Sequence, residues 1–275
     1  MRKKSKVTRI IAVLIAIPIA IVAAIHITHA LTLDRVIEYT EVPFYSARIP
    51  VEMDGYRVAF ITDTHRISDA KLQEVVDRLN EWQADILLLG GDLGSRRDGD
   101  PRRTIEALAQ VVTTDGIFGV EGNHDKYREL FPVMEANNMT PLSNSGLLIR
   151  ESFYLAGVED KWNRDPDIAQ ATADAGPDDF VILISHNPDI SMRQDTSNID
   201  LILSGHTHGG QITFFGIYAP ALWPRHITHY GQRFMSGWAE SRDGTPIYVS
   251  RGTGEYLPRV FARPQVILIT LYSEE

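Results

Sequence analysis

The chain has 275 residues and no cysteine, which excludes disulfides, zinc–thiolate sites and cysteine nucleophiles. Its formal net charge is −9, but five basic residues lie before residue 10, so the remainder carries 22 basic against 36 acidic residues, a net charge of −14. An acidic body is a poor electrostatic partner for nucleic acid, which normally binds a basic stripe. We therefore expect no nucleic-acid partner.

The N-terminal region predicts a membrane segment. Residues 10–25 are apolar without a break and follow a basic segment at residues 1–9. Extending the run to residue 31 reaches the roughly 20 residues that cross a bilayer as a helix, so we expect a transmembrane signal-anchor over residues 10–31. A cleaved signal peptide is the alternative. The basic flank predicts a cytoplasmic N-terminus and a body outside the cytoplasmic membrane.

The remainder, residues 34–275, is expected to be one domain in which strands and helices alternate. Residues 36–42 alternate apolar and polar side chains as a half-buried strand does, and Pro43 is expected to end it. The next predicted strands span residues 58–61, 86–89 and 117–120, and the helices between and after them residues 68–83, 100–112 and 127–137. This order is typical of an α/β fold.

The second half of the chain contains mainly strand signals. Apolar runs predict strands at residues 181–184, 201–203, 147–149, 153–156, 247–249 and 266–271. The runs at residues 147–149, 153–156, 247–249 and 266–271 have no convincing helices between them, which indicates antiparallel strands and a second sheet stacked on the first. Residues 209–246 are rich in glycine, proline and aromatic residues and are expected to form a long loop bordering the site.

Five of the apolar runs stop abruptly at polar residues. The side chains that follow them are Asp63 and His65, Asp92, Asn123 to Asp125, His186, and His206 with His208. Sites in open α/β sheets form beyond the carboxyl ends of the strands, so one shared polar site is expected. Each element alone has another explanation, since Gly-Asp is often a turn and Gly-Asn-His-Asp suits tight turns. Two histidines in the glycine-bounded loop 205–210 are harder to explain by packing.

The combined donor set indicates two metal ions. Carboxylate, amide and imidazole donors without a thiolate suit Mn²⁺, Fe or Zn²⁺ rather than Ca²⁺ or Mg²⁺ alone. Seven donors exceed what one ion takes from protein when water must also bind. Two ions that share a bridging carboxylate account for the number.

The five motifs, which span residues 58–208, resemble those of the calcineurin-like metallophosphoesterase superfamily in order and spacing. The run from Gly205 to Gln211 further resembles a membrane-associated bacterial branch that includes YkuE- and YaeI-type phosphodiesterases and UDP-2,3-diacylglucosamine hydrolases. The resemblance implies a four-layer α/β/β/α sandwich of two mixed sheets. Thr64 and Arg66 depart from the usual first motif without touching a ligand, which leaves the substrate open.

The resemblance also implies a role for each motif residue. The first metal would be held by Asp63, His65 and His208, and the second by Asn123, His186 and His206. Asp92 would bridge the two, and His124 would be the catalytic proton donor or transition-state stabiliser. Asp125 would orient His124, with a turn role equally open. Arg251 is a candidate phosphate contact, with a surface salt bridge as the alternative. His226 and His229 lie in the long loop and either contact substrate or are solvated.

These assignments imply a membrane-anchored, dinuclear metal-dependent phosphodiesterase or pyrophosphatase that uses a metal-activated hydroxide. Mn²⁺ is the expected metal, with Fe or Zn²⁺ as alternatives. The anchor points to a substrate in lipid metabolism or the cell wall, such as a lipid-linked nucleotide sugar, a phospholipid or a wall polymer. A catalytically inactive scaffold used as an interaction module is the alternative, although such a scaffold is expected to have lost ligands.

Overall fold

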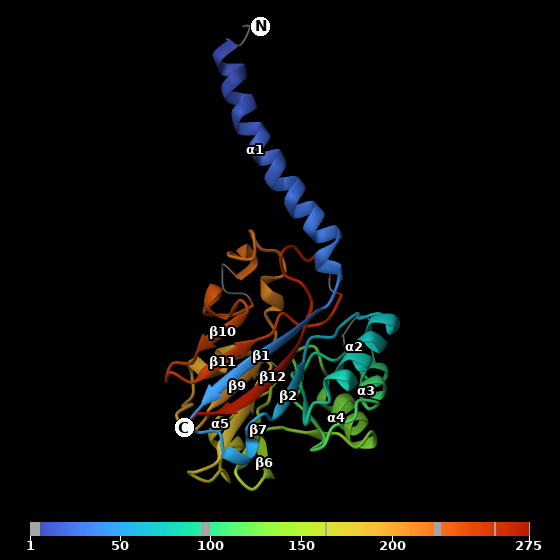
Figure 1. The fold of residues 1–275 in the computed structure, drawn as a ribbon, viewed down its shortest axis with the longest axis vertical. Helices are drawn as coiled ribbons and strands as arrows, with labels where there is room; N and C mark the ends of the chain where they lie inside the picture. Colours follow the sequence, from blue (N-terminus) through green and yellow to red (C-terminus); the bar gives the residue numbers. More distant parts are fainter. Residues whose placement is uncertain (1–5, 95–99, 163, 223–226, 256, 275) are drawn as a thin grey trace.

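Two sheets of six strands form the body of the protein in this computed structural model (Figure 1). The structure describes residues 6–94, 100–162, 164–222, 227–255 and 257–274. The strands are β1 (Glu38–Ser46), β2 (Arg57–Ile61), β3 (Ile86–Leu89), β4 (Ile117–Gly119), β5 (Thr140–Pro141), β6 (Ser145–Arg150), β7 (Phe153–Gly157), β8 (Phe180–Ile184), β9 (Leu201–Ser204), β10 (Gly237–Glu240), β11 (Pro246–Val249) and β12 (Gln265–Ser273). The α-helices are α1 (Lys6–Leu31), α2 (Asp69–Trp82), α3 (Arg102–Leu108), α4 (Tyr127–Ala136) and α5 (Ile168–Ala171).

Both sheets are mixed. The first has the order β1-β12-β2-β3-β4-β5 and the second the order β10-β11-β9-β8-β7-β6. In the first sheet only the β12–β2 pair is antiparallel, and in the second the β10–β11 and β6–β7 pairs are antiparallel. Two mixed sheets in an α/β body, preceded by one apolar helix, confirm the expected fold class.

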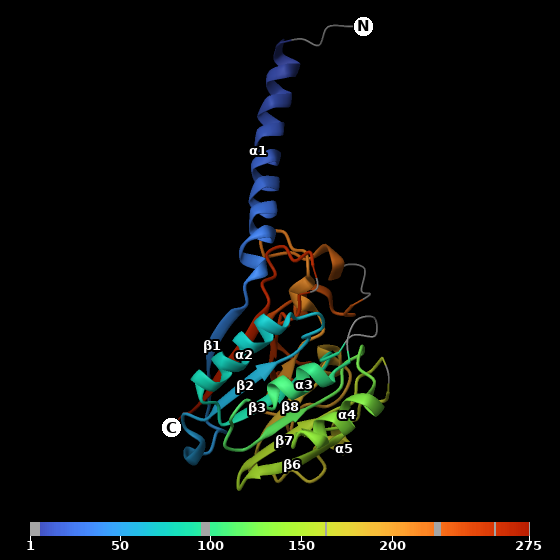
Figure 2. The same cartoon turned by 90° about the vertical axis from the view of Figure 1, so that its right-hand side faces the viewer.

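The apolar runs form strands because both of their faces are covered. Side chains such as Phe60 and Leu88 from the first sheet pack against Phe180 and Leu203 from the second, and together they form the core between the sheets. The other face of the first sheet is covered by α2, α3 and α4 (Figure 2). The other face of the second sheet is covered, among the described residues, by the four-residue α5 and short 3-10 turns. The fourth layer is therefore thin.

The longest helix, α1, projects away from the body (Figure 1). It buries none of its side chains, and among the described residues it is the one helix long and apolar enough to cross a membrane, with a mean hydropathy of 2.9. Its far end begins at Lys6, so residues 1–5 of the basic segment lie outside the described residues.

Some expected elements are wrong in their bounds or pairing. β1 continues through Pro43 to Ser46, because it is an edge strand and the missing N–H of a proline is tolerated there. The helix expected over residues 100–112 ends at Leu108. The expected loop at residues 209–246 contains β10. The late strands are only partly antiparallel, since β7 and β11 each pair with one antiparallel and one parallel neighbour. The last expected strand, β12, lies in the first sheet rather than the second, between β1 and β2.

The strand directions place the predicted site at the α1 end of the body. β1 starts beside the end of α1 and runs away from it, and β12 is parallel to β1 (Figure 1). β2 is antiparallel to β12, and β3 and β4 are parallel to β2. The carboxyl ends of β2, β3 and β4 therefore point back toward α1.

Candidate metal centre

The loops after β2 and β9 bring three predicted ligands together. The Nε2 atoms of His65 and His208 lie 3.2 Å apart. Asp63 Oδ1 lies 3.4 Å from His208 Nε2 and 3.8 Å from His65 Nε2. A carboxylate oxygen and two imidazole nitrogens this close form a group that could hold one metal ion.

A second group forms where β3, β4 and β8 end. His186 Nε2 lies 3.4 Å from Asp92 Oδ2 and 3.2 Å from Asn123 Oδ1. The same Asp92 oxygen lies 3.5 Å from His65 Nε2 in the first group. Asp92 Oδ2 therefore lies between the two groups, which is where a bridging carboxylate has to be.

Backbone carbonyls orient two of the histidines. His186 Nδ1 lies 2.7 Å from the carbonyl of Gly90, so Nδ1 carries the proton and Nε2 is left as the donor to a metal. His206 has the reverse orientation, because its Nε2 lies 3.0 Å from the carbonyl of Ile227. The His206 ring lies 5.1 Å from that of His186. Its Nδ1 is thus the atom that a metal would use.

The hydrogen bonding of the two buried aspartates fits metal binding. Asp63 Oδ2 accepts from the Thr62 hydroxyl and from the backbone N–H of His206, and Asp92 Oδ1 accepts from the backbone N–H of His124. Asp63 Oδ1 and Asp92 Oδ2 are buried without a hydrogen-bond partner among the described residues. Unpaired buried carboxylate oxygens are costly, and metal ions between the two groups would satisfy both.

The charges of the site suit cations. Burial opposes ionisation of Asp63 and Asp92, but the surrounding histidines outweigh it and hold the pKa of both carboxyls below the usual range. Burial lowers the pKa of His206 to about 4 and that of His208 to about 3, so both are neutral donors at pH 7. Burial also acts on His186, but Asp92 and Asp63 raise its pKa well above 6.5.

The ligand-bearing backbone is held in an uncommon conformation. The residues with positive φ at the site are Asp63 (53°), His65 (33°), Asp92 (54°), His206 (69°) and His208 (51°). Non-glycine residues adopt this region rarely, and such strain clusters at functional sites where the surrounding structure enforces it. The left-handed conformation turns the backbone sharply where a strand ends, so that the side chain of the turning residue faces the centre.

The two predicted catalytic residues differ in exposure. His124 is exposed, and its ring lies 5.5 Å from that of His65 at the edge of the centre. Asp125 is buried, and its carboxylate accepts from the backbone N–H groups of Leu93, Gly94 and Gly122. The Gly122 contact lies within the turn and the other two come from the loop after β3, so both roles that the sequence left open for Asp125 stay predictions. Burial, together with Asp92, raises the pKa of Asp125 to about 7 despite those N–H groups.

A family model described as calcineurin-like phosphoesterase matches residues 56–210, which include all seven predicted ligands. The chain belongs to this family. The expectation of a metal-dependent phosphoric ester hydrolase is thereby confirmed, and the donor groups support two metal ions. The identity of the metals and the role of each residue stay predictions.

Curated relatives of this phosphoesterase agree with the family. It is 30% identical over 258 residues to YkuE of Bacillus subtilis, an uncharacterized metallophosphoesterase. The aligned region covers 87% of each of the two chains. An uncharacterized metallophosphoesterase of Campylobacter jejuni is 27% identical and covers 100% of this chain and 74% of that protein. A transmembrane protein with metallophosphoesterase domain from Danio rerio is 28% identical over 94% of this chain, which spans 62% of that relative's length.

Arg251, the predicted phosphate contact of the phosphoesterase, is engaged by other protein groups. Its guanidinium pairs with Glu38 at 2.5 Å and donates to the carbonyl of Arg263 at 3.0 Å. The salt bridge that the sequence left open is thus present. His229 is likewise engaged, at 2.9 Å from the buried carboxylate of Asp189, and His226 lies outside the described residues.

Sequence reasoning missed Arg259, which is fully buried beside the centre. Its Nη1 donates to the carbonyls of Arg251 and Ala262, and its Nη2 lies 3.4 Å from Nδ1 of the predicted ligand His208. Burial lowers the pKa of Arg259 to about 10, so it stays charged at pH 7. The sequence carries no signal for it, because the contact joins segments that are 51 residues apart.

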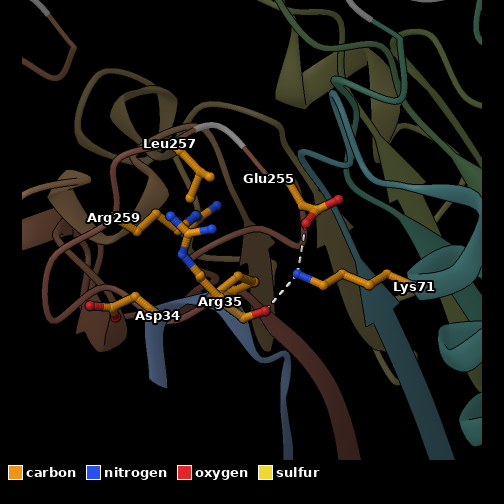
Figure 3. Close-up of a pocket in the computed structure, with 7 residues that line it drawn as sticks. Asp34, Arg35, Lys71, Glu255, Leu257 and Arg259 are labelled. Atoms are coloured by element: carbon orange, nitrogen blue, oxygen red, sulfur yellow. Dashed lines mark hydrogen bonds and ion pairs between the residues drawn. The ribbon is translucent and has the colours of Figure 1, made fainter. Parts of the chain in front are cut away.

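Arg259 also lines a pocket of about 230 Å³ next to the end of α1 (Figure 3). Arg35, Lys71 and Glu255 form other parts of its wall. Lys71 bridges the carboxylate of Glu255 at 2.7 Å and the carbonyl of Arg35 at 2.5 Å. With Asp34, the charged lining of the pocket is three cations and two anions, and Leu257 and Pro264 complete the wall.

Proposed function

We propose that the protein is a membrane-anchored, dinuclear metal-dependent phosphodiesterase or pyrophosphatase. One observation carries the proposal: the buried oxygens Asp63 Oδ1 and Asp92 Oδ2 have no hydrogen-bond partner among the described residues and face the imidazole nitrogens of His65, His186 and His208. Asp92 Oδ2 lies within 3.5 Å of a histidine from each group, which supports its proposed place between two ions.

The seven predicted ligands would form two sets, one for each metal ion, with one residue shared between the sets. Asp63, His65 and His208 would hold one ion, Asn123, His186 and His206 the other, and Asp92 both. Bound there, two divalent ions supply an activated water nucleophile and neutralise charge on the phosphoryl oxygens. Mn²⁺ suits this oxygen and nitrogen donor set, with Fe or Zn²⁺ as alternatives.

His124 would handle the proton of the leaving oxygen. It is the exposed member of the histidine group, so it can reach a substrate without displacing a ligand. Its backbone N–H donates to Asp92 Oδ1 at 2.7 Å, which holds it at the edge of the centre. A positioned imidazole contributes about 10²–10⁴-fold to such proton transfers.

The anchor favours a substrate at a membrane or cell wall. We propose a lipid-linked phosphoester or pyrophosphate, in the manner of the YkuE-type branch that the motifs resemble. We also propose that α1 crosses the cell membrane once with its N-terminus in the cytoplasm, because Lys6 and Arg9 precede the apolar run. A reporter that is active only in the cytoplasm should show no activity when it is fused to the C-terminus. Activity of that fusion would show that the body lies in the cytoplasm.

The proposal is tested with the metal-stripped full chain in detergent. Hydrolysis of bis-p-nitrophenyl phosphate and p-nitrophenyl phosphate is measured after adding Mn²⁺, Zn²⁺ or Mg²⁺, together with the metal content per chain. We expect metal-dependent cleavage of the diester in preference to the monoester. Asp92→Ala should lose both metals and turnover, whereas Asp178→Ala, which removes an exposed carboxylate before β8, should keep both.

The alternative of an inactive scaffold predicts a different result. A scaffold that retains its ligands would bind two metals and hydrolyse neither compound, nor any lipid-linked pyrophosphate offered in mixed micelles. Metal-dependent turnover that Asp92→Ala abolishes would exclude it. Preference for the monoester would argue against the diesterase assignment and leave the phosphoesterase family intact.

A further inference from the structure

An exposed apolar turn lies on the same end of the body as α1. Within residues 212–218, Ile217 is 78% exposed, Phe214 54%, and Ile212 and Tyr218 each 45%. Residues 209–222 contain no charged side chain, although the 23% charged content of the chain would give about three in a segment of this length. A contiguous apolar surface of this kind marks an interaction site rather than an ordinary solvent-facing loop.

Ring contacts fix the position of the turn against α1. The ring of His26 stacks on Phe214 at 5.3 Å and meets the edge of Phe215 at 4.5 Å. His29 stacks on Phe261 at 3.9 Å. Both views show the segment that follows β9, drawn in orange, beside the body end of the helix (Figure 1, Figure 2). The turn therefore lies at the level of the last two turns of α1.

The length of α1 gives the depth of those contacts. A helix rises 1.5 Å per residue and the hydrocarbon core is about 30 Å thick. If α1 enters the hydrocarbon core of the bilayer at Ile10, directly after Arg9, it crosses that core in about 20 residues and leaves it near His29. His26 then lies about 4.5 Å inside the boundary. The phenylalanine rings that touch it then lie at the boundary between headgroups and acyl chains, where the apolar faces of membrane-surface segments are buried.

The backbone of the turn is suited to a medium of low polarity. Phe214 donates its N–H to the carbonyl of Tyr218 at 2.7 Å, and Ile217 donates to Phe214 at 3.0 Å. Thr213 donates to the carbonyl of Val260 at 2.9 Å. These bonds satisfy three of the backbone N–H groups of the turn, which lowers the cost of placing it at the boundary of the bilayer.

We infer that the turn at residues 212–218 rests in the boundary of the bilayer that α1 crosses, and that its partner is the lipid surface itself. The inference rests on the proposed anchoring by α1. The ligand His208 precedes Ile212 by four residues, so their Cα atoms are at most about 14 Å apart. The membrane contact thus holds the metal centre within reach of phosphoesters in lipid headgroups.

The absence of cysteine allows a direct test with single-cysteine variants of the full chain in lipid nanodiscs. Ile217→Cys, Ile19→Cys and Val51→Cys are each labelled with an environment-sensitive fluorophore, and lipids that carry a quencher are introduced. The three side chains are aliphatic and 78%, 63% and 81% exposed. Val51 follows β1, whose nine residues extend about 30 Å away from α1.

We expect lipid quenching at positions 217 and 19 and none at position 51. Quenching at 19 without quenching at 217 would overturn the inference while leaving the anchor in place. No quenching at either position would refute the anchor, and the inference with it. A blue-shifted probe at 217 that lipid quenchers do not reach would mean that a second copy of the chain or another protein covers the turn, which also overturns it.

Discussion

The segment between β11 and β12 is predicted to support the metal centre through one glycine. Gly252 has φ of +69°, and a Cβ built on it would lie 2.6 Å from the Cβ of Asp63. Its carbonyl accepts from Gln265 at 2.8 Å and its N–H donates to the Ser250 hydroxyl at 3.0 Å, so its backbone is held in place. Gly252→Ala should therefore displace Asp63.

Gly237 is a matched control, because it also has a positive φ (+78°) and a Cβ there would meet nothing within 4 Å. Alanine at a left-handed position costs about 1–2 kcal/mol, and the lower entropy of the unfolded chain returns about 0.4–1 kcal/mol. Gly237→Ala should thus lower the free energy of unfolding by about 0–1.6 kcal/mol. Gly252→Ala adds overpacking of about 1–3 kcal/mol.

The assay is urea unfolding of the metal-free full chain in detergent, followed by metal titration. For Gly252→Ala we expect the larger loss of stability and, because a ligand is displaced, about 10–100-fold weaker metal binding, as for other changes that misorient ligands. Gly237→Ala should bind metal as the unchanged protein does. Equal stability losses and unchanged metal affinity in both variants would refute the reasoning.

Three further predictions concern single side chains. His124→Ala should keep both metals and lower turnover by about 10²–10⁴-fold, measured by metal analysis and steady-state kinetics; loss of metal would make His124 a ligand. Because the pKa of His186 is raised well above 6.5, metal binding at pH 7 should release about one proton and strengthen as pH rises. The binding enthalpy measured by calorimetry should then change with the ionisation enthalpy of the buffer, and an enthalpy that is the same in all buffers would contradict this. Burial raises the pKa of Glu121 to about 7 against its usual 4.5, with Glu159 adding to and Arg164 opposing the shift, so its ionisation destabilises the folded state as pH rises through 7. Glu121→Gln should raise the free energy of unfolding by about 1–3 kcal/mol at pH 8 and by little near pH 4.5; an equal effect at both pH values would count against it.

Local sequence determined which side chains reach the site. Apolar runs that stop at Asp63, Asp92 and His186 form strands with buried faces, so polar residues placed just after them must emerge at the sheet edge. The 3.6-residue period likewise predicted α2, whose observed bounds differ from the expected ones by one residue at each end. These features depend on residues that are close together in the sequence, so the pattern of residue types predicts them.

The roles that depend on distant segments were decided by the tertiary structure alone. The carbonyls of Gly90 and Ile227 determine which nitrogen of His186 and His206 is left for a metal. Asp125 binds N–H groups of the loop after β3, a partner that the Gly-Asn-His-Asp motif does not name.

The position of the metal centre at the α1 end of the body also could not be predicted from the sequence. It follows from the insertion of β12 between β1 and β2, parallel to one and antiparallel to the other. Strand order and direction depend on packing between segments that are far apart in the sequence, such as β1 and β12. The sequence by itself therefore determined the chemistry of the site, and only the folded chain decided which way the site faces.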